Sequence, residues 1–237
     1  MINEKPEIIE VPLVLEEDDV WRVLGAKDRV VTELQSEVCE AIDEVSKFSI
    51  PLAIFQKVEV DTIEPKRVKF RSGAEVSNKF AAHLFQGAEE AFFVVATVGP
   101  DIDYRISQLI TAGDNVEAIV MDAVGTAAAF NTFTYVLDSL LSRTVSRDWK
   151  MGTCLRPGQS YWDISGQSVI FESLSAEKIG VKLLSSSFMT PQKSQSGIVP
   201  IGPYLKIEDD PSNSYCRYCK ASRCPMRVEP FDGVVKK

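Results

Sequence analysis

Apolar residues recur at helical spacing near the start of the chain. Between Asp28 and Phe48 they fall three or four positions apart, at Val31, Leu34, Val38, Ala41, Ile42 and Val45. This spacing predicts an amphipathic helix over 28–48, which ends before Pro51. Cys39 lies within this segment and is expected to pack against the core. Residues 1–27 predict an extended arm with a short helix at 19–24.

Runs of apolar and β-branched residues predict the strands. Ala91–Val98 is an unbroken apolar run apart from Thr97, and Gly99-Pro100 follows it, which indicates a buried strand. The other predicted strands are shorter and lie at 52–60, 68–70, 180–186 and 198–201. Further helices are expected at 77–88, 101–112, 114–143 and 167–174.

The long helix at 114–143 is the one segment apolar enough to raise the question of a membrane span. It carries Glu117, Asp122 and Asp138, which are costly in hydrocarbon, so a buried core helix is the better interpretation. Its small residues, such as Ala123 and Gly125, allow close packing against a sheet.

The strands and helices alternate irregularly along the chain, which predicts an α+β fold rather than a doubly wound sheet. We expect one such domain at 28–210, preceded by the arm at 1–27 and followed by a basic, cysteine-containing tail at 211–237. The chain has 237 residues, 45% of them hydrophobic, so a core can form without disulfides.

Charge and cysteine usage narrow the possible partners and the compartment. The formal net charge is −8, which argues against a general nucleic-acid binder because phosphate contacts need a basic face. The first ten residues lack the basic start and apolar run of a secretory signal. Five cysteines, an odd number, fit a reducing cytoplasm better than export.

Three cysteines crowd together near the C-terminus, as Cys216-x2-Cys219-x4-Cys224. Thiolates at this spacing can hold an iron–sulfur cluster or zinc, and the surrounding arginines and Lys220 favour the thiolate. A closed site needs four ligands. Either Cys154 or Cys39 supplies the fourth, or the site stays open, or the thiols bind no metal and lie free on a tail.

Two loops carry candidate binding chemistry. In the first, the Pro157-Gly158 turn allows close approach of the backbone to a ligand, Arg156 can clamp a carboxylate or phosphate, and Tyr161 can form an aromatic wall. The alternative is a surface turn with a solvated arginine. The second loop, 185–197, is rich in hydroxyls that either bind a polar ligand or cap strand ends. His83, the sole histidine, has no marked catalytic partners and is expected to be structural.

Together these stretches resemble the activation (reactivation) domain of cobalamin-dependent methionine synthase, in a short stand-alone form. The likeness spans about residues 90–202 in the expected order. It is carried by Ala96-Thr97-Val98-Gly99-Pro100-Asp101-Ile102-Asp103, Gly113-Asp114, Met121-Asp122-Ala123-Val124-Gly125-Thr126, Pro157-Gly158, Trp162, Gln167, Gly180-Val181-Lys182-Leu183, Met189-x-Pro191 and Lys193-Ser194-x-Ser196-Gly197.

The resemblance implies an α+β domain with a twisted antiparallel sheet that binds S-adenosylmethionine and docks on a corrinoid protein or methyltransferase. There it helps cobalt in the partner's cobalamin regain a methyl group after one-electron reduction. The ligand contacts that it implies fall on Arg156, Pro157, Gly158, Tyr161 and Met189.

The chain departs from the family pattern in two places. Cys154 takes the position of the family's arginine and Gln159 that of its tyrosine, although Arg156 and Tyr161 lie nearby. The long helix also lacks a glutamate over 126–131. Two classes of function therefore stay open: an activation factor in a cobalamin-dependent methyltransferase system, or an iron–sulfur or zinc redox or scaffold subunit without S-adenosylmethionine chemistry.

Overall fold

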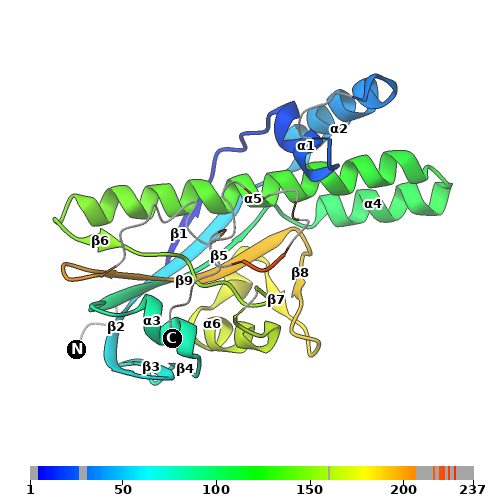
Figure 1. The fold of residues 1–237 in the computed structure, drawn as a ribbon. Coiled ribbons are helices and arrows are strands. Elements are labelled where there is room, and N and C mark those ends of the chain that lie inside the picture. The colour runs from blue at the N-terminus through cyan, green and yellow to red at the C-terminus, as the bar shows by residue number, and fades with distance from the viewer. Residues whose placement is uncertain are drawn as a thin grey trace.

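The structure is a computed structural model that describes residues 5–26, 31–159 and 161–206, and in the C-terminal tail 216, 219–221, 224 and 227. A curved antiparallel sheet runs through its middle (Figure 1). The long helix α5 (Asn115–Val145) crosses one face of the sheet, and α3 (Lys79–Leu84) and α6 (Gln167–Ser173) lie on the other.

The sheet is built around β5 (Glu90–Thr97), which pairs along its whole length with β2 (Leu52–Glu64) and β9 (Ser194–Gly202). Its interior residues are buried because helices cover both faces, so the sequence is continuously apolar rather than alternating. Four further strands extend the sheet outward: β1 (Glu7–Glu10), β3 (Arg67–Phe70), β4 (Glu75–Val76) and β6 (Lys150–Met151). Strands β1 and β3 pair with β2, β4 pairs with β3, and β6 pairs with β9.

Strand alternation divides the core into two layers. One set of residues, including Phe93 and Ile198, packs toward α3 and α6. The opposite set, including Val199 and Ile201, packs under Phe133 and Leu137 of α5. A two-stranded hairpin, β7 (Lys182–Leu183) and β8 (Met189–Thr190), stands apart from the main sheet and leads into β9.

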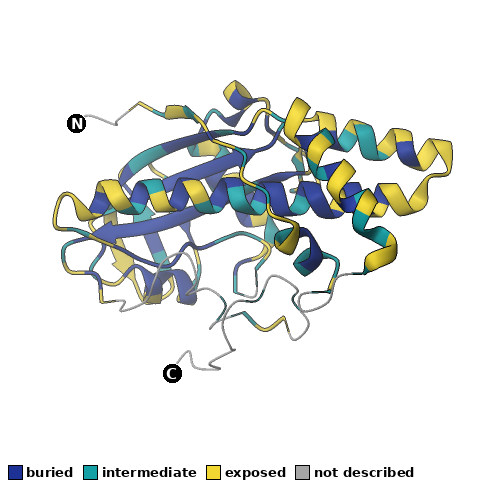
Figure 2. Ribbon diagram, turned by 90° about the horizontal axis from the view of Figure 1, so that it is seen from above, coloured by how far each residue is buried: buried dark blue, intermediate teal, exposed yellow. Residues whose placement is uncertain are grey.

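The first half of α5 extends beyond the sheet and forms a helical layer of its own. There it packs against α1 (Glu17–Val23), α2 (Gln35–Phe48) and α4 (Asp101–Ala112). Figure 2 shows this end of the molecule with exposed outer helix faces around a buried seam. Helix α5 thus belongs to two cores at once, a helical one and one against the sheet.

Several expectations from the sequence are confirmed. The fold is α+β with a curled antiparallel sheet, α4 covers 101–112 as predicted, and α5 runs two residues past the expected end. Among the described residues, no helix is both long and apolar enough to cross a membrane.

Other expectations need correction. Helix α2 begins at Gln35, after a short 3-10 turn at Thr32–Leu34, and Asp28 lies outside the described residues. Cys39 is exposed rather than packed, because it lies off the apolar stripe formed by Val38, Ala41 and Val45. Its thiol lies 3.4 Å from Glu17 Oε1.

Two predicted elements are shorter than expected, and part of the predicted arm belongs to the sheet. The helix expected at 77–88 is α3 alone, and the strand expected at 180–186 is the two-residue β7. Strand β1 pairs with β2. The division into arm, domain and tail stays a prediction, and most of the tail at 211–237 lies outside the described residues.

Gly197 on β9 provides a test of this packing. A Cβ added there lies 2.5 Å from Cys154 Sγ and 3.2 Å from the Leu155 carbonyl oxygen. We expect Gly197→Ala to lower the free energy of unfolding by about 1–3 kcal/mol, because the strand and the 154–155 segment cannot both keep their positions. Urea denaturation followed by circular dichroism measures the change.

A double-mutant cycle with Cys154→Ala makes this test specific. Removing the sulfur vacates the space that the new methyl group needs, so the combined loss is expected to be smaller than the sum of the two single losses. Simple additivity would contradict the proposed contact.

Candidate ligand-binding site

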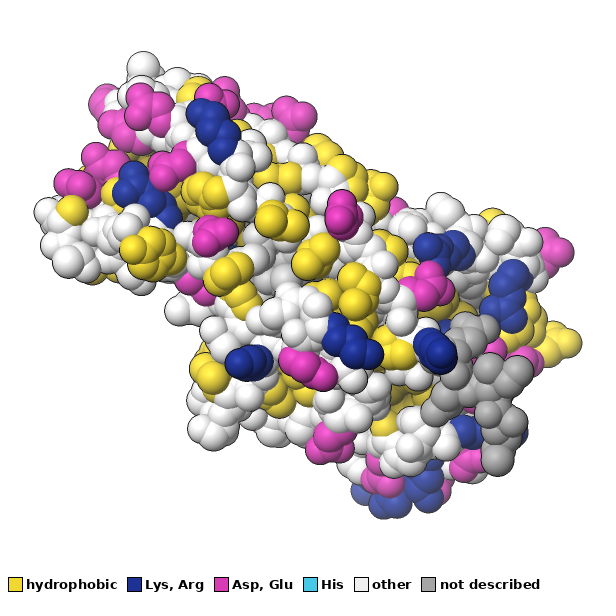
Figure 3. Space-filling model, turned by 180° about the vertical axis from the view of Figure 1, so that it is seen from behind, with side chains coloured by type: hydrophobic (Ala, Val, Ile, Leu, Met, Phe, Trp, Pro, Cys, Tyr) yellow, Lys and Arg dark blue, Asp and Glu magenta, His cyan; other side chains and the backbone are white. Residues whose placement is uncertain are grey.

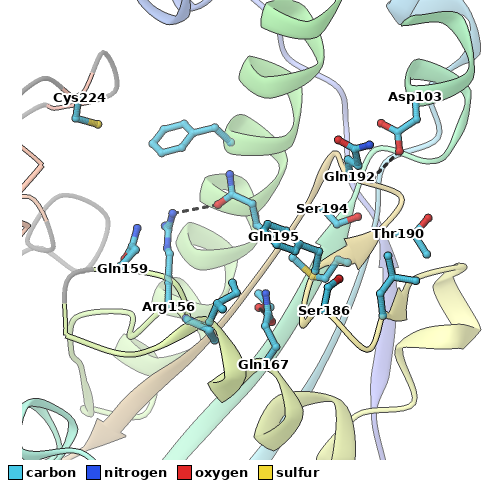
Figure 4. A pocket seen from close by; sticks show the side chains of 17 residues that line it. Asp103, Arg156, Gln159, Gln167, Ser186, Thr190, Gln192, Ser194, Gln195 and Cys224 are labelled. Atoms are coloured by element: carbon cyan, nitrogen blue, oxygen red, sulfur yellow. Dashed lines mark hydrogen bonds between the residues drawn. The ribbon is translucent and has the colours of Figure 1, made fainter. Parts of the chain in front are cut away.

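A cavity of about 1050 Å³ opens where the two predicted loops meet. Its walls come from the start of α4, the middle of α5, the loop at 156–164, the β7–β8 hairpin and the start of β9 (Figure 4). The two backbone bends, which are more than 30 residues apart in sequence, therefore face one cavity.

Pairing with β9 sets the position of the first bend. Leu155 forms an isolated antiparallel bridge with Ile198, with backbone hydrogen bonds in both directions. Immediately afterward the chain turns at Gly158, which has φ +82°, a conformation that favours glycine. The Gly158 N–H donates to the Trp162 carbonyl at 2.8 Å and closes the loop.

The second bend is tied to α4. The Gln192 N–H donates to Asp103 Oδ2 at 2.6 Å, just before β9 begins. Lys193 follows and is 9% exposed. Its Nζ donates to Asp122 Oδ1 at 2.7 Å and to Thr126 Oγ1 at 3.0 Å, both on α5. These contacts hold the start of β9 against both helices.

Both faces of β9 contribute polar groups to the cavity. Ser194 and Ser196 lie on the α6 side, where Ser196 Oγ donates to Gln167 Oε1 at 2.5 Å. Gln195 lies on the α5 side with Arg156 and Phe130. Strand alternation thus directs hydroxyls and an amide to opposite sides of one strand.

Arg156 is the one cation among the described residues that line the cavity. Its guanidinium lies 4.6 Å from the ring centroid of Phe133, and Nη1 donates to Gln195 Oε1 at 3.0 Å. Nε is buried and has no hydrogen-bond partner among the described residues. Asp103 is the one carboxylate among the described lining residues, and its Oδ2 already accepts the Gln192 N–H.

The structure brings some predicted site residues together and separates others. Arg156, Pro157 and Met189 line the cavity. Gly158 and Tyr161 instead line a neighbouring shallower hollow, where the Tyr161 ring packs 4.5 Å from the ring of Phe80. The assignment of all five as ligand contacts stays a prediction.

Several lining residues were not singled out as site residues from the sequence. Gln195 is in a strand, Phe130 is in a helix and Asp103 is at the start of a helix. The local sequence around each of them does not indicate that they line one cavity. Only the sheet pairing that places Arg156 beside Gln195 reveals their common location. Gln167 and Asp103 did appear in the ordered motif series, and Gln195 lies within the second candidate loop at 185–197.

The cysteines of the tail are described only in part. Cys224 lines the cavity, and Cys219 packs against the core layer on the α3 and α6 side of the sheet. The Arg227 guanidinium donates to the carbonyls of Cys216, Cys219 and Ala221 at 2.8–2.9 Å. Among the described residues, no group of three or more cysteine, histidine or acidic side chains is placed to hold a metal. The metal site at Cys216, Cys219 and Cys224 stays a prediction.

Cys154, one candidate for a fourth ligand, is buried. It is 1% exposed, on the α5 side of the sheet against Gly197 and Phe133. Burial raises the pKa of its thiol, and the nearby Arg156 guanidinium opposes this only in part. The neutral thiol is therefore favoured, which suits packing better than metal ligation.

Comparison with known proteins gives a clear structural likeness. No family model and no curated protein sequence match the chain. Among solved structures, a crystal structure of the MetH reactivation domain bound to AdoHcy superposes with a TM-score of 0.66. It covers 91% of this chain and 86% of that one, at 15% sequence identity. At this identity the likeness shows the fold alone.

Proposed function

We propose that the protein is an activation or accessory factor for a corrinoid protein, binding S-adenosylmethionine or its product in the cavity. The observation that carries this proposal is the cavity itself. It forms where the two motif-bearing bends meet, in a fold shared with a domain solved in complex with AdoHcy.

The lining suits an adenosyl amino acid. Phe130, Ile164, Leu184 and Met189 provide apolar surface for a purine ring, and the hydroxyls of Ser186 and Thr190 can accompany a ribose. Arg156 provides a cation for the carboxylate at the other end of such a ligand. The size of the cavity leaves room for all three parts.

In this proposal the chain binds and orients the ligand while the reacting atoms belong to others. The sulfonium of S-adenosylmethionine supplies the methyl group, and reduced cobalt in the partner's cobalamin receives it. Arg156 fixes one end of the ligand, and Pro157 lies beside it in the cavity wall. Leu184 and Phe188, 48% and 62% exposed, form an apolar rim for the partner.

Removing the cation tests the ligand assignment. We expect Arg156→Met to weaken S-adenosylhomocysteine binding by roughly tenfold or more in isothermal titration calorimetry, because a charged hydrogen bond contributes about 1.5–3 kcal/mol. Arg147→Met is the matched control, since that guanidinium stacks on Trp149 outside the cavity. Absence of binding to the unaltered protein would contradict the proposed ligand.

Removing the rim aromatic tests the docking assignment. We expect Phe188→Ser to weaken capture of a purified cobalamin-loaded corrinoid protein by roughly tenfold, because a central apolar anchor is lost. Tyr204→Ser is the control, because it removes an even more exposed aromatic, 76% exposed, that is not part of the cavity lining. Equal affinities for both variants would contradict docking at this rim.

A second candidate function rests on Cys224. Because this cysteine lines the cavity, a zinc ion or iron–sulfur cluster held by Cys216, Cys219 and Cys224 would lie beside the bound ligand. The protein would then be a redox or scaffold subunit, and both roles are compatible because reductive activation of cobalt needs an electron source.

Anaerobic purification tests this second function. We expect metal analysis to find bound iron or zinc, with visible absorbance in the case of iron, and we expect Cys224→Ser to reduce the metal content severalfold. Cys39→Ser is the control because Cys39, although a candidate fourth ligand by sequence, lies exposed on α2 beside Glu17 and does not line the cavity. A metal-free protein with freely titratable thiols would remove the metal function and leave the ligand proposal intact.

A further inference from the structure

Arg156 has an unusual set of neighbours for a half-buried cation. Among the described residues, its guanidinium contacts the Gln195 amide oxygen, the Cys154 thiol, the face of Phe133 and, at 6.0 Å, the face of Phe130, and it forms no ion pair. Cations withdrawn from water are normally paired with an anion. Here the charge is held in place without being neutralised.

The contrast with Lys193 shows that this is not a general feature of the region. Lys193, whose side chain is 10% exposed, also borders the long helix and forms an ion pair with Asp122 at 2.7 Å. Lys193 directly precedes β9, and Arg156 lies beside Gln195 of the same strand. Of these two cations, only Lys193 has a carboxylate partner among the described residues. Lys193 therefore serves the fold, and the charge of Arg156 is left available to the cavity.

Gln195 is the residue that makes this possible. Its backbone is fixed by pairing with Ala96 of β5, in the rigid centre of the sheet. Its side chain lies on the α5 side of β9, and its Oε1 accepts from Arg156 Nη1 at 3.0 Å (Figure 4). A glutamate at this position would have the same length and shape but would form a closed ion pair with the guanidinium.

We infer that Gln195 is a positioning residue that holds Arg156 over Phe133 and, being neutral, keeps its charge for the anionic end of the ligand. The site is accordingly selective for ligands with a carboxylate at this end. This inference deepens the proposed ligand assignment and does not depend on the corrinoid partner.

The orientation also has an energetic basis. An arginine side chain has several rotatable bonds, and fixing it costs conformational entropy. When Gln195 and the Phe133 face hold the guanidinium in advance, the ligand does not have to order it. Gln195 accepts one N–H of Nη1, and the remaining Nη N–H groups stay available to a carboxylate.

Gln195→Glu is the decisive variant, tested by calorimetry with two ligands. S-adenosylhomocysteine carries the carboxylate, and 5′-methylthioadenosine lacks the whole amino-acid end. We expect Gln195→Glu to weaken S-adenosylhomocysteine at least tenfold and to change methylthioadenosine affinity less than twofold. We expect Gln195→Met, which removes the acceptor without adding charge, to weaken S-adenosylhomocysteine by only a few fold.

Gln86→Glu is the matched control, because it adds the same charge at an exposed position outside the cavity lining. It is expected to leave both affinities unchanged. If Gln195→Glu binds S-adenosylhomocysteine as tightly as the unaltered protein does, the positioning role is refuted while the proposed ligand stands. An equal loss of both ligands would also refute it, since a merely structural effect does not distinguish them.

A ligand-independent measurement covers the case in which neither nucleoside binds. The Arg156 Nε–H resonance, assigned by its loss in Arg156→Lys, is followed by NMR during titration with acetate. We expect the resonance to shift in the unaltered protein and to stay fixed in Gln195→Glu. A resonance that does not respond to acetate in the unaltered protein would overturn the inference, separately from any result on the adenosyl ligand.

Discussion

The strict alternation of side chains along β9 is the constraint on which the rest of this site depends. Because β9 is paired with β5 over its first eight residues, its register cannot slip without reversing every side chain. Ser194 and Ser196 therefore stay on the α6 side, and Gln195 and Gly197 on the α5 side. Gly197 lets the 154–155 segment come close, and that approach brings Arg156 to Gln195.

Helix α5 joins this strand to the second part of the molecule. Its later half packs on the sheet through Phe133 and Leu137, and its earlier half packs on α1, α2 and α4. Gly125 lies in the earlier half, where an added Cβ would be 2.7 Å from Ile102 and 3.0 Å from Lys193. The small residue allows the buried Lys193 side chain to cross the helix and reach Asp122. The cavity thus lies at the seam of two cores. Figure 3 shows the molecule from behind, relative to Figure 1, with many acidic side chains gathered at one end.

Local patterns in the sequence predicted the elements well where they had a clear period or a clear stop. Helix α4 was predicted to the residue because Gly99-Pro100 precedes it and Gly113, at φ +90°, ends it. Strand β5 was predictable because its apolar run is too short for a typical helix and is bounded by turn residues. The helix predicted over 28–48 was wrong at its start. Its apolar spacing continues through the 3-10 turn at Thr32–Leu34, and only the hydrogen-bond pattern distinguishes such a turn from an α-helix.

The site was predictable only as two separate loops. Arg156 and Pro157 were identified from their chemistry, but the partner of Arg156 is 39 positions away and on a strand whose facing direction depends on register. Tyr161 looked equally suitable, yet it lies beyond the Gly158 turn and packs on Phe80. The turn at Gly158 therefore places Arg156 and Tyr161, which are close in sequence, in two different hollows.

One departure from the pattern that the sequence resembles, the cysteine at position 154, can be explained from this geometry. Cys154 and Arg156 are two positions apart on an extended segment, so they lie on the same side of it. A cysteine at 154 fills the space beneath Gly197 with a small, neutral side chain, while the arginine two residues later reaches the cavity from the same side. Moving a cation by two positions on a strand keeps its facing direction, whereas a shift of one would have placed it in the α6 core. The altered loop is thus compatible with a cation in the cavity. Because Gln195 is neutral, it orients the Arg156 guanidinium without neutralising its charge.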